Sequence, residues 1–270
     1  MIDRLSKKDL TGEEVEFLKR AEAFFNNPSL FVTGMNWFAK PINYAEHRLP
    51  ERARQRITLA SQLAITRGLE YSIKTLPQSI PKQSFLKSNE NSKRASLIHK
   101  GVVTTAGGLS GFFGLAALPI ELPFVTISLL RLIAEIARQY GNDPSSIETQ
   151  LDCNYVLSMG NQSSIEGYYA SRIAFTELQS KAISFIASCT TKEILAAIEN
   201  KTAPALIRLI GEIASQFEIR LARKILSQAI PVSGALAGGT LNFLFANYYG
   251  EYARYHFGLK RIEREHGLNS

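Results

Sequence analysis

The chain has 270 residues, of which 45% are hydrophobic, and its 18 glycines and 10 prolines are too few for a disordered protein. Its 31 Lys and Arg residues outnumber 24 Asp and Glu residues, and the net charge of +7 favours an anionic partner: nucleic acid, an acidic protein or a lipid surface. The polar start MIDRLSKKDL has no apolar signal segment, and the two cysteines form no CxxC pair. We therefore expect a cytoplasmic protein without disulfides.

The N-terminal third predicts helices followed by a loop. Thr11 and Glu14 have the spacing of a capping box, which predicts a first helix over about 12–26. A short helix carrying the single tryptophan follows, and Pro50 precedes a longer one over about 51–76. Residues 77–94, PQSIPKQSFLKSNENSKR, are polar and contain two prolines, so we predict a linker or mobile loop.

Helical periodicity also dominates the rest of the chain. Apolar residues of RLIAEIARQYG form one stripe, which predicts an amphipathic helix that ends at Gly141. Further helices are expected over about 144–160, 168–188, 192–200 and 203–228, and a last helix after Pro231 to about His256. The prediction is an all-α multi-helix bundle in one domain, 1–270. Its parts are the N-terminal helices (12–76), the loop (77–94), core helices (95–258) and a charged tail (259–270).

Two glycine-rich apolar segments stand out. Residues 104–130 contain one charged side chain, Glu121, and residues 225–250 contain none. Small residues recur four apart, as in Gly107 with Gly111 and Gly234 with Gly238, a spacing that lets two helices approach closely.

Three interpretations of these segments compete. A phosphate-binding loop requires a preceding strand and a lysine, which are absent. Full membrane spans require about 20 strongly apolar residues, and these runs are diluted by glycine and hydroxyl side chains. Two close-packed helices at the centre of the bundle remain, either as a soluble core or as a hairpin that dips into lipid. The basic net charge favours membrane association.

The same segments resemble a known family. GGLSGFFGLAALPIELP followed by LLRLIAEIARQYG resembles the central signature of the EcsC family, and IPVSGALAGGTLNFLFANYYGEYARYHF resembles its C-terminal signature. LDCNYVLSMG is similar to the short helix between them, and the resemblance extends over about 12–258. It implies membrane association, and the name-giving bacterial protein is encoded beside an ABC exporter. It implies no established catalytic activity.

The positions that match these signatures are binding or structural candidates without an assigned catalytic role. They are Gly107, Gly108, Gly111, Gly114, Pro119, Glu121, Arg131, Tyr140, Gly141, Pro231, Gly234 and Asn242. Gly238 and Glu135 join this set because each lies four residues after one of its members, Gly234 and Arg131 respectively.

Glu121 is the best single candidate for catalysis, because it is an isolated acid between Pro119 and Pro123, which we expect to form an elbow. Burial would raise its pKa, but a glutamate in the first turn of a helix is also simply favoured by the helix dipole. Arg131 and Glu135 are four apart and predict a helical ion pair. Asn242, a lone amide in an apolar helix, is expected to satisfy backbone near Pro231 or to line a ligand cavity.

No motif identifies a reaction. The four histidines are scattered without metal-ligand spacing, and His256 is expected to flank the last helix; we expect no metal and no cofactor. Basic clusters lack any nucleic-acid-binding motif, so nucleic acid is not expected as a partner. The aromatic residues from Phe243 to Tyr255 predict either core packing or an interfacial belt.

The functional hypothesis is a membrane-associated accessory protein at the inner face of the cell membrane. It would bind lipid or a partner in a membrane transport complex. The alternatives are a membrane-acting hydrolase with Glu121 and Arg131 in a buried pocket, and a soluble helical interaction module.

Overall fold

The computed structural model describes residues 10–27, 75–77, 79–111, 118–158, 164–188, 193, 196, 200 and 234–267. These ranges contain six helices and no strand, which confirms the all-α prediction. The helices are α2 (Gly12–Asn26), α5 (Phe85–Gly111), α6 (Leu118–Gln139), α7 (Ile147–Ser158), α8 (Ile165–Ser188) and α11 (Gly234–Glu265). The helices expected over most of 28–76, at 192–200 and over 203–228 lie largely or wholly outside the described residues.

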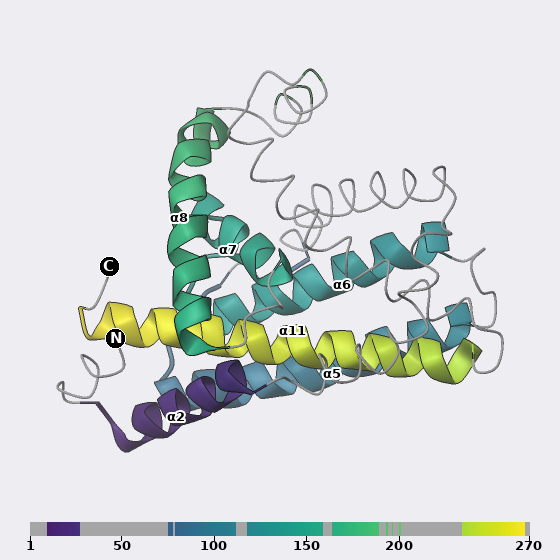
Figure 1. Ribbon diagram of the computed structural model, residues 1–270, viewed down its shortest axis with the longest axis horizontal. Coiled ribbons are helices and arrows are strands. Elements are labelled where there is room, and N and C mark those ends of the chain that lie inside the picture. The colour runs from purple at the N-terminus through teal and green to yellow at the C-terminus, as the bar shows by residue number, and fades with distance from the viewer. Residues whose placement is uncertain are drawn as a thin grey trace.

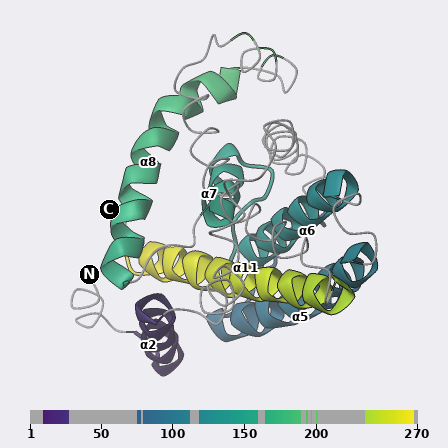
Figure 2. The same ribbon diagram turned by 45° about the vertical axis from the view of Figure 1, so that its right-hand side comes forward.

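Helices α5, α6 and α11 lie side by side and form the centre of the bundle (Figure 1). Asn242 contacts Val103, and Arg254 contacts Asn89, so α5 and α11 run antiparallel. Gln83, just before the start of α5, contacts Gln139 at the end of α6, so α6 is antiparallel to α5 and parallel to α11. Three helices in this arrangement bring the C-terminal end of α5 to the N-terminal ends of α6 and α11 (Figure 2).

The remaining helices cover one end of this centre. Helix α7 packs against α6 and α11, and α8 crosses α11 at a steep angle (Figure 1). Helix α2 contacts α8, α11 and α5. Its predicted capping box is confirmed: the Thr11 amide donates to Glu14 Oε2 at 2.8 Å, and the Glu14 amide donates to Thr11 Oγ1 at 3.3 Å.

Helix α6 follows its amphipathic pattern closely. The predicted apolar stripe is fully buried, namely Leu129, Leu132, Ile133, Ile136 and Tyr140. Gly141 has φ +83°, and the amides of Gly141 and Asn142 donate to the carbonyls of Arg138 and Ala137. These two bonds are those of a Schellman motif, in which glycine adopts the left-handed conformation at no steric cost. Gly141 therefore ends the helix, as predicted.

The predicted loop over 77–94 is wrong for its second half, because α5 begins at Phe85. Ser88, Ser92 and Ser96 are spaced four apart and are all buried. A helix face of small polar side chains that packs against another helix does not show the apolar periodicity on which the prediction relied.

The predicted charged tail is also wrong: α11 continues to Glu265, and its last turns bury Leu259 and Ile262. His256, expected to flank the helix, lies well inside it and is 1% exposed. The charges of this segment are tolerated because other helices supply their partners.

The expected Pro-Glu-Pro elbow is absent, since α6 begins at Leu118 and includes both prolines. Pro119 is the second residue of the helix, where a missing N–H costs nothing. Glu121 is the fourth residue, in agreement with a first-turn glutamate, and the structure describes its backbone but not its side-chain contacts.

Candidate functional site

The outer face of α5 changes character along the helix. Its first half exposes Leu86, Lys87, Glu90, Lys93 and Arg94. From residue 97 the exposed positions become uncharged: Leu97 is 66% exposed, Ile98 68% and Val102 50%. Isolated exposed leucines are common on proteins, but three large apolar side chains on adjacent turns form a patch that requires an explanation.

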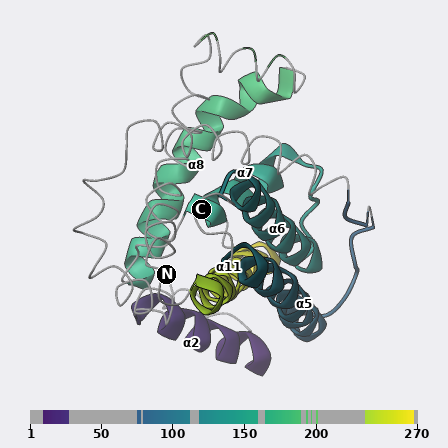
Figure 3. The same ribbon diagram turned by 90° about the vertical axis from the view of Figure 1, so that its right-hand side faces the viewer.

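Two neighbouring helices add aromatic rings at the same end of the molecule. Phe124 in the first turns of α6 is 43% exposed, and Phe243 in α11 is 44% exposed. Figure 3 looks along the three helices from the side on which α5 ends and α6 and α11 begin. Phe124 and Phe243 lie within the first ten residues of their helices, whereas Leu97 and Ile98 lie near the middle of α5. We call Leu97, Ile98, Val102, Phe124 and Phe243 the apolar end.

Cations border the apolar end. Lys93 and Arg94 are exposed one turn before Leu97. The Lys100 ammonium lies 5.9 Å from the centroid of the Phe243 ring, and burial lowers the pKa of this lysine. On the α6 side, an Arg131 guanidinium nitrogen donates to the Thr75 hydroxyl.

The helices beneath the apolar end are joined by polar contacts. Asn242 is fully buried, and its Nδ2 donates to the Val103 carbonyl at 3.1 Å. This amide therefore links α11 to the backbone of α5. Pro231 lies outside the described residues, so the expected contact near it, like the ligand cavity, stays a prediction. The buried serine face of α5 lies against α11, where a Cβ added at Gly250 would overlap Ser96 Oγ.

The expected ion pair between Arg131 and Glu135 is not formed. Glu135 instead accepts from Arg138 Nε at 3.0 Å and Nη2 at 2.7 Å, and from Gln139 Nε2 at 2.6 Å. Arg138, three residues after Glu135, provides a guanidinium that binds both carboxylate oxygens. Such a bidentate partner is stronger than a single contact with Arg131 would be. Helix α6 also separates Glu121 from Arg131 by ten residues, about 15 Å of helical rise, so they do not form a compact pair.

The predicted signature glycines are placed only in part. Gly107, Gly108 and Gly111 lie in the last turns of α5, and Gly234 and Gly238 in the first turns of α11. Their backbones are helical, the atoms packed against them are not described, and Gly114 and Pro231 lie outside the described residues. The predicted close packing through these glycines therefore stays a prediction.

Two other glycines make the close helix contacts that the structure shows. Gly250 faces Ser96 of α5, and Gly258 faces the Phe17 ring of α2, which would overlap an added Cβ. Glycine inside a helix costs about 1 kcal/mol relative to alanine, so each position is a signal of close packing that sequence reasoning could have used.

The end of α11 opposite to the apolar end contains a set of charged residues that we call the clamp. Its members contact neighbouring helices; they are Arg254, Lys260, Arg261, Glu263, Arg264 and His266. Sequence analysis missed this site, because the partners are distant in the sequence.

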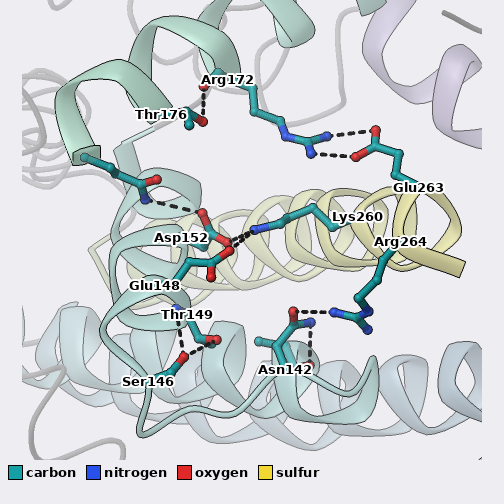
Figure 4. A network of polar contacts seen from close by, with 12 residues as sticks. Asn142, Ser146, Glu148, Thr149, Asp152, Arg172, Thr176, Lys260, Glu263 and Arg264 are labelled. Carbon is teal, nitrogen blue, oxygen red and sulfur yellow. Dashed lines mark hydrogen bonds and ion pairs between the residues drawn. The ribbon is translucent and has the colours of Figure 1, made fainter. Parts of the chain in front are cut away.

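The clamp joins α11 to α7 and α8 through ion pairs (Figure 4). Glu263, 2% exposed, accepts from both terminal nitrogens of Arg172 at 2.9 and 2.5 Å. Lys260 pairs with Asp152 and lies 3.3 Å from Glu148, and Gln179 donates to Asp152 at 3.3 Å. Buried charges are favourable only when paired and hydrogen-bonded, and these are.

The clamp joins α11 to the N-terminal half of α5 and to α6 as well. Arg254 donates to Asn89 Oδ1 at 3.0 Å, an atom that also accepts from the Tyr140 hydroxyl at 3.2 Å. Arg261 donates to the Gln83 carbonyl at 2.9 Å.

The C-terminal residues of the clamp reach α6 and α2. Arg264 donates to the Tyr140 carbonyl at 3.1 Å, just past the end of α6. It also donates to Asn142 Oδ1 at 3.4 Å (Figure 4). His266 Nε2 lies 3.1 Å from Glu14 Oε1, so the clamp also contacts the capping box of α2. One helical segment thus connects five neighbours.

His256 lies among these charges and faces the core. Its Nδ1 is 3.0 Å from the Tyr168 hydroxyl, and burial together with Arg172 and Lys260 lowers its pKa well below the usual value. Five of the six aromatic residues expected in the core or in an interfacial belt are buried, namely Phe245, Tyr248, Tyr249, Tyr252 and Tyr255. Core packing is therefore confirmed for these five, whereas Phe243 belongs to the apolar end.

The described ranges hold no group of three metal-ligating side chains. Cys153 is a buried free thiol whose pKa is raised by burial, and Cys189 lies outside the described residues. The arrangement offers an apolar surface with bordering cations and a network of ion pairs around the last turns of α11.

Fold and surface define an all-α bundle with one apolar, basic-rimmed end. A family model for the EcsC protein family matches residues 17–262. The chain therefore belongs to the EcsC family, as the sequence resemblance indicated. No curated protein and no solved structure matched the chain in the corresponding comparisons. Among the helices that the structure describes, none has the length and apolar content needed to cross a membrane.

Proposed function

We propose that this EcsC-family protein binds the surface of anionic membranes, with the apolar end inserted among the lipids. The observation that carries the proposal is the change on the outer face of α5 from charged residues to Leu97, Ile98 and Val102. A helix that exposes mainly charged residues along one half, with Leu86 among them, and uncharged, mostly large apolar residues along the other matches a boundary between water and lipid.

Energetics support a peripheral contact. Full burial of a leucine or isoleucine side chain contributes about 1.5–3 kcal/mol. Leu97, Ile98 and Val102 are already partly buried in the fold, so their insertion is worth roughly 3 kcal/mol together. Such a contact alone is weak and reversible, comparable to marginal anchoring by a single acyl chain.

The bordering cations supply a second attraction. Lys93, Arg94 and Lys100 lie within two turns of the patch, and each basic residue near an anionic surface contributes about 1 kcal/mol. The two contributions together are roughly 6 kcal/mol, which corresponds to binding between millimolar and micromolar lipid. Stable anchoring of a protein to a membrane usually combines two weak interactions, here apolar insertion and the attraction of basic residues to anionic lipid.

The docked orientation leaves the clamp away from the lipid. Phe243 and Glu263 are 20 residues apart on α11, about 30 Å along the helix axis. We place the protein at the inner face of the cell membrane, as an accessory that holds lipid or a component of a membrane transport complex. The rigid clamp end would then face the cytoplasm or the partner.

Vesicle co-sedimentation tests the proposal. The full chain is mixed with vesicles of phosphatidylglycerol and phosphatidylcholine, and the bound fraction is measured against lipid concentration. Replacement of Leu97, Ile98 and Val102 by serine is expected to weaken binding at least tenfold, because about 3 kcal/mol of apolar transfer is lost. Charge reversal at Lys93 and Arg94 is expected to weaken binding at low salt and to have little effect at high salt.

Matched controls come from other helices. Ile173 on α8 is 65% exposed, so Ile173→Ser removes an equally exposed apolar side chain away from the apolar end. Lys19→Glu on α2 reverses an exposed charge away from it. Both controls are expected to bind vesicles like the wild type. Undiminished binding by the triple serine variant would contradict the proposal and favour a helical interaction module that does not use this surface.

A further inference from the structure

The exposed face of α5 carries a stripe of two leucines with an acid and a base between them. Leu86, Glu90, Lys93 and Leu97 are spaced four, three and four residues apart, and all four are exposed. Residues at these spacings lie on one side of a helix. Leu86 is 44% exposed and Leu97 66%, and the Glu90 side chain is 54% exposed. We call these four residues the α5 stripe.

The α5 stripe is complementary to itself. Its spacing of four, three and four residues stays the same when the helix is turned end for end, and it is the heptad spacing of helices that pack side by side. A twofold axis between Glu90 and Lys93 sets Leu86 of each copy opposite Leu97 of the other. The same axis sets Glu90 of each copy opposite Lys93 of the other. Such a contact closes on itself in a dimer, because both copies use the same surface.

We propose that two copies of this protein pack antiparallel through the α5 stripe and form a weak dimer in the absence of lipid. Charge sets the direction, because a parallel arrangement would place Glu90 opposite Glu90 and Lys93 opposite Lys93. Glu90 is the only acidic residue in the sequence of α5. The antiparallel dimer gives this acid a basic partner in each copy.

The charged residues of the α5 stripe are accessible to a second copy. Lys87 Nζ lies 3.9 Å from Glu90 Oε2, and both side chains are more than half exposed. An ion pair with this exposure contributes little, so Glu90 can exchange it for a pair across the dimer at small cost. Four leucines and two ion pairs cover less surface than a standard interface, so the dissociation constant is expected to be on the order of 100 μM.

The dimer goes beyond the proposed function and shares one residue with it. Leu97 belongs to both the apolar end and the α5 stripe, so it cannot contact lipid while it packs against Leu86 of a second copy. Leu86 and Glu90 lie outside the apolar end. The dimer and the docked monomer are therefore alternative states, and the dimer covers part of the surface that docks.

Sedimentation velocity of the full chain without lipid tests the dimer, over protein concentrations from about 5 to 500 μM. Glu90→Lys and Lys93→Glu each place like charges opposite each other, and each variant is expected to remain monomeric. The double variant restores opposite charges in the same register and is expected to dimerise as the wild type does. Leu86→Ser removes two leucine contacts from each dimer and is expected to weaken it by about tenfold or more.

The control for the charge reversal is Glu16 on α2. Its side chain is also 54% exposed and also pairs with a basic residue of its own helix, Arg20. Glu16→Lys is expected to dimerise like the wild type, and circular dichroism of each variant confirms that the helices are intact. A wild type that stays monomeric over the whole concentration range would overturn the dimer. Failure of the double variant to dimerise, or unchanged dimers in Glu90→Lys and Leu86→Ser, would overturn it as well.

Vesicle binding separates this inference from the proposed function. Leu86→Ser is expected to bind vesicles at least as tightly as the wild type, because it keeps the apolar end and weakens the competing dimer. Weaker vesicle binding by Leu86→Ser would overturn the exclusion between dimer and docked monomer. Undiminished vesicle binding after serine replacement of Leu97, Ile98 and Val102 would overturn lipid docking alone, because the dimer is measured without lipid.

Discussion

The two ends of the α5–α11 pair are held together and exposed in different ways. At the clamp end, charged side chains of α11 pair with residues of neighbouring helices, and Arg254 and Glu263 are buried, as in the pair of Glu263 with Arg172. At the apolar end, large hydrophobic side chains such as Leu97 and Ile98 point outwards. Along this single pair of helices, charged residues are buried at one end and large apolar residues are exposed at the other, which is the opposite of the usual distribution.

This difference indicates that the two ends have different roles. Buried ion pairs contribute little net stability compared with apolar packing, but their geometry is specific, so they set how the helices are positioned. Exposed apolar side chains contribute nothing to the fold and gain free energy only when another phase or partner covers them. Because removal of one member leaves a buried charge without its partner, variants at the clamp end are expected to lower stability, and variants at the apolar end to weaken binding.

The largest expected loss of stability comes from a variant that breaks an ion pair of the clamp. Glu263→Ala leaves the Arg172 guanidinium, whose side chain is 19% exposed, without its carboxylate partner. Removal of one member of a buried pair costs about 3 kcal/mol, measured as the free energy of unfolding in urea. Glu265→Ala is the matched control two residues further on, because Glu265 is 42% exposed and its pair with Arg261 is worth less than about 1 kcal/mol. Equal losses in the two variants would contradict a specific role for the buried pair.

A smaller effect is expected for two glycines of the α5–α11 pair, of which Gly250 is packed against α5 and Gly101 is open to solvent. Gly250→Ala places a Cβ against Ser96 Oγ and is expected to lower the free energy of unfolding by about 1–3 kcal/mol. Gly101→Ala, at the apolar end of α5, meets no atom within 4 Å and is expected to stabilise the protein by up to about 1 kcal/mol. Thermal unfolding measures both signs.

A double variant identifies the cause of the loss. Ser96→Ala removes the overlapping oxygen, so Gly250→Ala in that background should cost less than it does alone. Additive losses would show that the close approach of the two helices is not what Gly250 provides.

The pH dependence of stability is expected to come from the clamp end. Burial lowers the pKa of His256 below its usual 6.5, so the unfolded chain binds more protons than the folded one. Stability from this residue is therefore complete above pH 6.5 and is lost as the pH falls below that value. One proton corresponds to a slope of about 1.4 kcal/mol per pH unit.

Urea unfolding between about pH 5 and pH 7 measures this slope, a window around the ordinary histidine pKa. His256→Gln is expected to flatten the curve by one proton. Tyr168→Phe removes the hydroxyl that contacts Nδ1 but keeps the buried imidazole, so it should retain the slope. An unchanged slope in His256→Gln would assign the pH dependence to other groups.

The smallest expected effect on stability lies at the apolar end. Leu97→Ser with Ile98→Ser replaces side chains that are 66% and 68% exposed, and the free energy of unfolding is expected to change by less than about 0.5 kcal/mol per site. The same variant is expected to lose much of its vesicle binding. A large loss of stability instead would show that this surface is part of the core.

Local signals in the sequence were sufficient for several elements. The capping box of Thr11 and Glu14, the buried stripe of α6 and the stop at Gly141 depend on residues a few positions apart, and all three are confirmed. The EcsC assignment also followed from the sequence, through the signatures around both glycine-rich segments.

The missed features depend on distant partners. The serine face of α5 looked like a loop because its periodicity is polar, and only contact with α11 shows its use. The last turns of α11 looked like a solvated tail because Lys260 and Glu263 are charged, and their partners lie about 90–110 residues away in the sequence.

For this protein, the sequence by itself determined helix type, several helix ends and family membership. These properties arise from hydrogen bonds and side-chain spacings within one or two helical turns. Tertiary structure alone decided which charges are buried and which apolar residues are exposed. Burial depends on what a neighbouring helix places opposite each side chain. Residue spacing within one helix does not show which neighbour that is.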